Sequence, residues 1–203
     1  MSKVIVTIGR QYGSGGRRIG ELVAKELGIS FYDKELITET AKKSGYSEEV
    51  LKNNDEKPTG SFLYSIVIGA NGGDSLPLDN KLFLAQFDTI KDIASKNSCV
   101  IIGRCADYAL EERNDVFNVF IYSDVEKRIK RVVEEYGVEE KKAADIINKT
   151  DKKRASYYNF YSGKKWGKAE SYNLCIDSGK FGIENTAKII ADCAINFEKS
   201  EKK

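Results

Sequence analysis

The sequence predicts an α/β protein, built on a mainly parallel five-stranded sheet with helices on both faces. First, short β-branched segments alternate along the chain with segments of helical periodicity. Second, the first β-branched segment runs directly into a glycine-rich loop and an amphipathic helix. Third, 203 residues with 41% hydrophobic content fit one substantial core, with room for a small insert but not for two large domains.

Five apolar segments bounded by turn residues or polar stretches are the predicted strands. They are Lys3–Ile8, Ile29–Tyr32, Cys99–Ile102, Val116–Tyr122 and Tyr172–Ile176. Because helices fill most of the intervals between them, we expect the strands to run parallel and ligands to bind at their carboxyl ends.

Two helices have the clearest sequence signals. The predicted helix Asp124–Tyr136 has Ser123 and Glu126 at the spacing of a capping box. Its predicted apolar face carries Val125, Ile129, Val132, Val133 and Tyr136, and its opposite face carries Lys127, Arg128, Lys130 and Arg131. The last helix is predicted over Ile183–Phe197, followed by a disordered tail at Glu198–Lys203.

The glycine-rich loop is the strongest indication of a binding site. A loop of this kind that leads into a helix presents several backbone N–H groups and the positive end of the helix dipole to one point, which suits phosphate. The Walker A pattern is not met, since Gln11 stands at its first glycine, Arg17 at its lysine and Arg18 at its hydroxyl residue. A dinucleotide-binding loop, with Asp33 as the acidic residue, and a structural turn without ligand stay open as alternatives.

Two further features carry charge. Arg104 follows the apolar strand Cys99–Ile102, where an arginine suits a phosphate ligand or, alternatively, an ion pair with Asp107 or Glu111. The segment Lys127–Lys168 holds 13 Lys or Arg against 6 Asp or Glu. It fits a solvated helical face, a polyphosphate clamp, or a nucleic-acid surface whose stacking aromatics would be Tyr157, Tyr158, Phe160, Tyr161 and Trp166.

The composition also excludes several classes of site. The sequence has no histidine, which removes His-dependent triads and most catalytic zinc sites, whereas phosphoryl transfer depends on Arg, Lys and Mg²⁺. Four cysteines without a C-x-x-C pair, and no signal-like or membrane-spanning apolar run, indicate a cytoplasmic protein with reduced thiols and no membrane partner. The region Asn53–Asn80 has no clear period and is predicted to be a flexible insert that covers a substrate.

Taken in order, the motifs resemble the cytidylate kinase-like branch of the P-loop nucleoside monophosphate kinases across nearly the whole chain. The matching segments are Ile8–Arg17, Phe31–Leu36, Val100–Arg104, the pair Asp151-x-x-Arg154, and Ile176–Ser178. The resemblance implies a three-layer P-loop NTPase fold forming one kinase domain: a core at 1–52, 79–136 and 170–197, an acceptor-binding insert at about 53–78, and a lid at about 137–169.

The same resemblance implies roles for individual residues. The ATP phosphates would be surrounded by Gly13, Ser14, Gly15, Gly16, Arg17 and Arg18. Arg104 would hold the acceptor phosphate, and the transferring phosphoryl group would be neutralised by Arg17, Arg128, Arg131 and Arg154. Asp33 and Asp151 are the carboxylates expected to contact metal, water or ribose, with Mg²⁺ bridging the β- and γ-phosphates. The metal ligands themselves are not predicted.

The sequence departs from cytidylate kinases at the positions that select the acceptor. Their Gly-Arg-Asp, whose aspartate reads cytosine, is here Gly103-Arg104-Cys105, and Asp107 is a candidate replacement for the base contact. The expected activity is therefore ATP-dependent phosphorylation of a nucleoside monophosphate, CMP or dCMP first. The alternatives are a kinase of another small acceptor and a catalytically weak nucleotide-binding module. Nucleic acid is not expected as a partner, and the sequence does not determine the oligomeric state.

Overall fold

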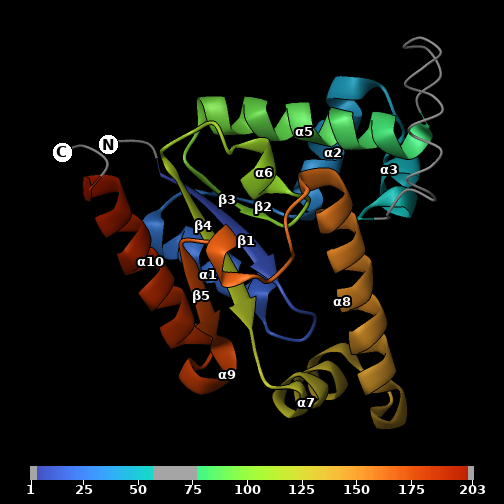
Figure 1. The fold of residues 1–203 in the computed structure, drawn as a ribbon, viewed down its shortest axis with the longest axis vertical. Helices are drawn as coiled ribbons and strands as arrows, with labels where there is room; N and C mark the ends of the chain where they lie inside the picture. The colour runs from blue at the N-terminus through green and yellow to red at the C-terminus, as the bar shows by residue number, and fades with distance from the viewer. Residues whose placement is uncertain (1–3, 57–76, 201–203) are drawn as a thin grey trace.

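Five parallel strands form one sheet in the order β2-β3-β1-β4-β5 (Figure 1). The computed structural model describes residues 4–56 and 77–200. The strands are β1 (Ile5–Arg10), β2 (Ser30–Tyr32), β3 (Cys99–Ile102), β4 (Val116–Tyr122) and β5 (Leu174–Asp177). The predicted fold class is confirmed, because all five predicted strands occur, pair in parallel and lie between helices.

Ten helical segments connect these strands within the described residues. The longer ones are α1 (Gly16–Leu27), α2 (Lys34–Ser44), α5 (Leu78–Lys96), α7 (Val125–Tyr136), α8 (Glu140–Ser162) and α10 (Ile183–Ser200). The shorter ones are α3 (Glu48–Asn54), α6 (Ala106–Ala109), α9 (Ser178–Phe181) and the 3₁₀ turn η1 (Ala169–Ser171). None of the described helices is both long and apolar enough to cross a membrane.

The alternation of side chains along the strands produces a core on each face of the sheet. On one face, Val6 and Ile8 of β1 pack with α1 and α10 through Ile19 and Ile190. On the other face, Ile5 joins a cluster with α2, α5 and α6 that includes Leu36, Ile90 and Leu110. Each side chain named here is at most 2% exposed, so both faces of the central strand are fully covered.

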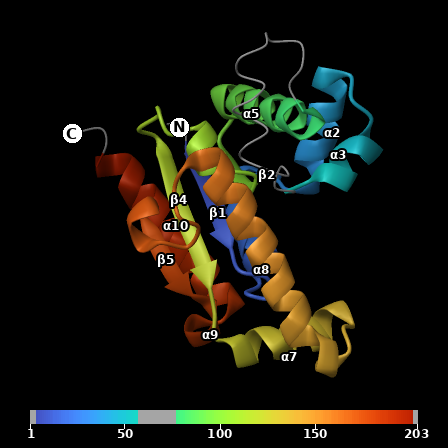
Figure 2. The ribbon, with the colours of Figure 1, turned by 45° about the vertical axis from the view of Figure 1, so that its right-hand side comes forward.

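Helix α8 crosses this second face along β1, from α7 at one end to α5 at the other (Figure 2). Near its start, Ala143 and Ile147 pack on Val132 of α7. Near its end, Tyr157 and Tyr158 join a cluster with partly buried aromatic side chains from α5 and α6. This helix therefore lies over the carboxyl half of β1, the region where the sequence predicts ligand binding.

Three local predictions are wrong. Helix α7 starts at Val125, and its N-cap, Asp124, makes no side-chain cap bond, so the predicted capping box is absent. The predicted apolar face of α7 is also wrong. Val125 and Tyr136, which the sequence places on it, are each 47% exposed, whereas Arg128, which the sequence places on the opposite face, is buried together with Val132. The last helix continues through Ser200, into the predicted tail. Most of the predicted insert Asn53–Asn80 lies outside the described residues.

The missing capping box has a local cause. The Ser123 backbone N–H donates to Gln11 Oε1 at 3.1 Å, and the Ser123 hydroxyl is buried beside Gly179 without a hydrogen-bond partner among the described residues. Ser123 therefore connects the end of β4 to the glycine loop instead of capping α7.

Candidate functional site

The loop between β1 and α1 places Gly13 and Gly15 beside the carboxyl end of the central strand, and Gly16 starts α1 directly after it. Gly13 and Gly15 have φ angles of 78° and 77°, which favour glycine. The Ser178 hydroxyl donates to the Ser14 carbonyl at 2.6 Å, and Arg131 Nη1 donates to the Gly13 carbonyl at 2.7 Å. Because the first N–H groups of a helix have no partner within it, the fixed loop and the start of α1 form a site for an anion.

A pocket of about 290 Å³ opens beside this loop. Its lining combines loop backbone, basic side chains and one carboxylate: Arg10, Gln11, Tyr12, Gly13, Gly15, Gly16, Arg17, Asp33, Ile102, Tyr136 and Arg154. Arg17 Nε donates to Asp33 Oδ2 at 2.8 Å, while the Arg17 side chain stays 47% exposed. The pocket thus offers positive charge and backbone donors to a polyphosphate. We refer to it below as the loop pocket.

Two residues from α7 and α8 hold the loop from the other side. Asp151 accepts from the Tyr12 backbone N–H at 2.7 Å and from Arg128 Nη1 at 2.6 Å. Arg128 Nη1 also donates to the Tyr12 carbonyl at 3.3 Å. In this arrangement Arg128 and Arg131 donate to the backbone of the loop, so the structure assigns them a bracing position. Their predicted role at the transferring phosphoryl group stays a prediction.

Arg104 lies in a strained turn after β3. Gly103, Arg104 and Cys105 have φ angles of 67°, 54° and 54°, and a left-handed conformation costs a non-glycine residue about 1–2 kcal/mol. Such strain is typical of functional sites. The turn directs the Arg104 guanidinium, whose side chain is 3% exposed, away from Asp107 and into a cluster of acidic residues.

In that cluster Arg104 pairs with Asp55 through two hydrogen bonds, Nε to Oδ1 at 2.9 Å and Nη2 to Oδ2 at 2.8 Å. Arg104 Nη1 also donates to Asp33 Oδ1 at 3.3 Å. Burial alone would lower the pKa of Arg104, but the charges of Asp55, Glu56 and Asp33 outweigh it and raise that pKa. The alternative of an ion pair with Asp107 or Glu111 is therefore wrong.

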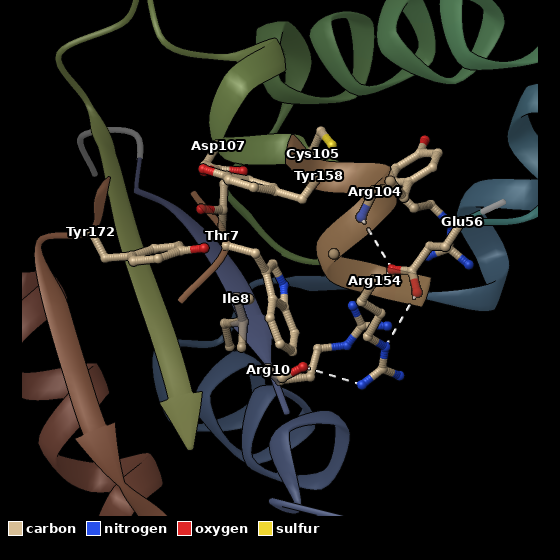
Figure 3. A pocket seen from close by; sticks show the side chains of 14 residues that line it. Thr7, Ile8, Arg10, Glu56, Arg104, Cys105, Asp107, Arg154, Tyr158 and Tyr172 are labelled. Atoms are coloured by element: carbon tan, nitrogen blue, oxygen red, sulfur yellow. Dashed lines mark hydrogen bonds and ion pairs between the residues drawn. The ribbon is translucent and has the colours of Figure 1, made fainter. Parts of the chain in front are cut away.

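Glu56 lies between the other two arginines of the site (Figure 3). Its Oε1 accepts from Arg10 Nη1 at 2.8 Å, and its Oε2 accepts from Arg154 Nε at 3.3 Å. Burial would raise the pKa of Glu56, but the charges of Arg10, Arg154 and Arg104 hold it well below the usual range. Glu56 is therefore ionised and shared by the three arginines, which we call the arginine cluster (Arg10, Arg104 and Arg154).

Arg154, on α8, is the least neutralised member of this cluster. Burial and the neighbouring charge of Arg10 lower the pKa of Arg154 to about 10, despite the opposing effects of Glu56 and Asp151. Its Nη1 donates to the Arg10 carbonyl at 3.1 Å, and its guanidinium lies 5.7 Å from the centre of the Tyr12 ring. Arg154 is therefore the arginine of the cluster whose charge is least compensated by the carboxylates around it.

A second, smaller cavity also has Arg10 and Arg154 in its lining (Figure 3). Its volume is about 20 Å³, room for roughly one water molecule. Its lining is Thr7, Ile8, Gly9, Arg10, Glu56, Gly103, Arg104, Cys105, Asp107, Arg154, Tyr157, Tyr158, Trp166 and Tyr172. We call it the aromatic cavity. Since the loop pocket and the aromatic cavity share Arg10 and Arg154, these two arginines stand between them.

Asp107 is the buried carboxyl group of the aromatic cavity. It accepts from the Tyr158 hydroxyl at 2.6 Å, and burial raises the pKa of Asp107. Its neighbour Cys105 also lines the cavity, and burial raises the pKa of that thiol as well. Cys105 is therefore a neutral, unreactive group, and Asp107 is the hydrogen-bonding residue that faces the cavity.

We expect the Asp107→Asn variant to be more thermostable than the wild type at pH 7, by about 2–4 °C, with the difference shrinking toward pH 4. A carboxyl group whose folded pKa is raised contributes stability below its unfolded pKa and loses that contribution as the pH rises through the folded pKa. Thermal unfolding of both proteins across this pH range measures the effect. Asp145→Asn, at an exposed residue of α8, controls for the loss of one charge, and an Asp107→Asn difference that does not change with pH would contradict the assignment.

The aromatic side chains of the segment Lys127–Lys168 pack against other side chains of the protein. Tyr161 stacks on Phe83 with ring centres 3.8 Å apart, Trp166 meets Phe120 edge to face, and Tyr157 and Tyr158 are each 5% exposed. Stacking of nucleic-acid bases needs exposed rings. The structure therefore gives no support to a nucleic-acid surface on α8.

Two carboxylates near the glycine loop, Asp33 and Asp151, were expected to contact metal, water or ribose. The described residues contain no group of three or more His, Cys, Asp or Glu side chains that could hold a metal. Mg²⁺ commonly needs only one or two carboxylates, with substrate phosphates and water completing its shell. Asp33 lines the loop pocket, where its Oδ2 accepts from Arg17 and its Oδ1 accepts from Arg104. Both oxygens of Asp151 are used by Tyr12 and Arg128. Asp33 is the one of the two whose partner, Arg17, is itself exposed in the pocket, so it would hold the ion by exchanging that contact.

Sequence reasoning identified Arg104, Arg154 and Asp33, which the structure brings together, and missed Arg10, Asp55 and Glu56. Arg10 could have been found, because it ends the first strand directly before the glycine loop. Asp55 and Glu56 had no comparable signal, since they are 49 and 46 residues away in sequence from the arginines they contact.

Comparisons with known proteins identify the family and the fold of the chain. The model of the cytidylate kinase-like family matches residues 5–180. A search of curated proteins finds no match. Among solved structures, an uncharacterized protein from Eubacterium ventriosum ATCC 27560 is 30% identical, with a TM-score of 0.71, over 98% of this chain and 99% of that one.

Two more distant structures share the fold alone. One is a shikimate kinase from Acinetobacter baumannii in complex with shikimate, at 15% identity and a TM-score of 0.53, covering 96% of this chain and 94% of its own. The other is a gluconokinase from Sinorhizobium meliloti 1021, at 13% identity and a TM-score of 0.52, covering 98% and 97%.

Proposed function

The chain belongs to the cytidylate kinase-like family, and from this membership and the geometry of its site we propose that it transfers a phosphoryl group from ATP to a nucleoside monophosphate, CMP or dCMP first. The family and the fold support kinase-type phosphotransfer with nucleotide use. The acceptor is the finer part of the proposal, and its support comes from the residues around the arginine cluster.

One observation carries the proposal: the loop pocket and the aromatic cavity meet at Arg10 and Arg154. Phosphoryl transfer needs a donor and an acceptor phosphate held in line, with positive charge between them, and little covalent chemistry from the protein. A donor in the loop pocket and an acceptor toward the aromatic cavity would place both arginines at the transferring group. Two adjoining sites with shared cations suit a kinase better than a simple nucleotide-binding module.

On the donor side, backbone N–H groups of the glycine loop and the start of α1 would hold the ATP phosphates, with Arg17 and Arg18 adding charge. Asp151, Arg128 and Arg131 keep the loop in this form from α7 and α8. Asp33 would hold Mg²⁺ together with the phosphates, and this ion would neutralise charge on the transferring group.

On the acceptor side, Arg104 would bind the phosphate of the monophosphate with its planar guanidinium. Asp107 would hydrogen-bond the base, in place of the aspartate that Cys105 replaces, after the aromatic cavity, which has room here for about one water molecule, has opened to admit it. Closure of α8 over the reacting groups would exclude water, which limits hydrolysis of ATP.

One observation favours a second candidate, a kinase that phosphorylates a hydroxyl group of a small acceptor without its own phosphate. Asp55 and Glu56 already neutralise Arg104 and Arg10, so the cluster is not an empty phosphate site in this conformation. Arg17 in place of the Walker lysine favours the third candidate, a module that binds nucleotide and transfers slowly.

The experiment that separates these candidates measures ADP release from ATP and Mg²⁺ by the purified protein. CMP, dCMP, UMP, AMP and GMP are offered singly, beside shikimate, gluconate and a control without acceptor. We expect rapid release with CMP or dCMP. Release only with an acceptor that lacks phosphate would support the second candidate, and ATP binding without release across the panel would support the third.

A further inference from the structure

The arginine cluster is already occupied by carboxylates of the protein itself. Arg104 makes a two-bond pair with Asp55, and Glu56 bridges Arg10 and Arg154 at 2.8 and 3.3 Å. Glu56 Oε1 also accepts from the Arg104 backbone N–H at 3.5 Å. The arginines therefore make with Asp55 and Glu56 the kind of contacts that they would make with the oxygens of a phosphate.

We propose that Asp55 and Glu56, which we call the acidic pair, act as an internal anion that competes with the phosphate of the acceptor for Arg10, Arg104 and Arg154. The inference rests on the proposed function for the identity of that acceptor. The ligand class it names is a phosphate monoester or inorganic phosphate bound at the arginine cluster.

Charge balance supports competition over simultaneous binding. With Asp33 included, three carboxylates already face Arg104, Arg10 and Arg154, while Arg17 shares Asp33. Adding a phosphate would place two further negative charges beside buried carboxylates, and such a juxtaposition of like charges is strongly unfavourable. The acceptor phosphate therefore takes over the arginines only when at least one carboxylate of the acidic pair leaves them.

The place of the acidic pair in the fold also suits competition with a phosphate for the arginines. It follows α3 directly, and Lys153 Nζ on α8 donates to the Asp55 carbonyl at 2.8 Å. Glu56 has a φ angle of 51°, so it holds an unfavourable left-handed backbone conformation while it contacts the arginines. The contact of Glu56 with the arginines is therefore held against an opposing backbone cost, which weakens it as a competitor of phosphate.

The first test compares Glu56→Gln with the wild type, because glutamine keeps the size of the side chain and removes its charge. We expect Glu56→Gln to bind inorganic phosphate about tenfold more tightly by calorimetry, and its melting temperature to rise more with added phosphate than that of the wild type. The KM for the monophosphate acceptor should fall by a similar factor, with the KM for ATP unchanged.

Two further variants accompany this test, one as a second test of the acidic pair and one as a control. Asp55→Asn, in which the pair with Arg104 alone is weakened, should tighten phosphate binding by a smaller factor, and it serves if Glu56→Gln does not fold. Glu48→Gln, in which an exposed carboxylate of α3 paired with Lys52 is removed, should leave phosphate binding at the wild-type value.

The outcomes separate this inference from the proposed function. Tighter phosphate binding in Glu56→Gln without turnover of any monophosphate supports the internal anion and contradicts the proposed acceptor. Phosphate binding that is unchanged or weaker in both Glu56→Gln and Asp55→Asn overturns the inference, whatever the activity, and leaves the acidic pair as a fixed part of the site.

Discussion

The Arg104→Ala variant should lose about 10²–10³-fold in kcat/KM for the acceptor while it keeps its affinity for ATP. In the proposed function Arg104 binds the acceptor phosphate through a buried, two-bond contact, and truncating one partner of such a contact costs about 2–5 kcal/mol of binding. The same variant also leaves Asp33 and Asp55 without this partner, so its folding is checked separately. Steady-state kinetics with the acceptor that turns over, together with a titration of ATP, measures the two effects separately.

Two controls accompany this prediction. Arg113→Ala removes a surface arginine that also makes two bonds to one aspartate, Asp115, and it should leave kcat/KM unchanged. Arg104→Lys keeps the charge that balances Asp55 and Asp33 but loses the two-bond geometry, so it should fold normally and still lose at least tenfold in kcat/KM. Wild-type activity in a folded Arg104→Lys or Arg104→Ala variant would remove Arg104 from the acceptor site.

The predictable part of this molecule is the part governed by local sequence. Each strand carries its own run of β-branched residues, and the parallel order follows from the helices between them, so the positions of Arg104 and of the glycine loop at one edge of the sheet could be inferred. The sequence also indicated that Arg154 belongs to the predicted lid at about 137–169, which was expected to lie over this edge of the sheet. What it could not supply was the set of carboxylates that the arginines contact.

Those contacts depend on packing between distant segments. Arg128 has the helical spacing of a solvent-facing residue, yet it is buried with its Nη1 bonded to Asp151 and the Tyr12 carbonyl, while its Nε has no hydrogen-bond partner among the described residues. Asp55 and Glu56 follow a short helix in a segment without clear periodicity, and their partners lie on β1, in the turn after β3 and on α8. Charge alone predicts that a buried arginine needs an anion, but not whether the protein or the ligand provides it.

The Gly13→Ala variant should be destabilised by about 2–4 kcal/mol and should bind ATP at least tenfold more weakly. A Cβ at this position would lie 2.9 Å from both the Arg128 carbonyl oxygen and the Val132 Cγ2 atom of α7, in a backbone with a φ angle of 78°. The left-handed conformation costs about 1–2 kcal/mol for alanine, and the overlap with α7 adds about 1–3 kcal/mol. Urea unfolding and an ATP titration measure the two losses.

Gly137→Ala is the matched control, because this residue ends the same helix α7 with a φ angle of 68° and would meet no atom within 4 Å. It carries the backbone cost without the overlap, so it should lose about 1–2 kcal/mol of stability and none of its ATP affinity. The difference between the two variants isolates the contact between the loop and α7. If both variants lose the same stability and bind ATP equally well, the close packing of α7 on Gly13 has no role in shaping the nucleotide site, and only the backbone conformation of the loop requires glycine there.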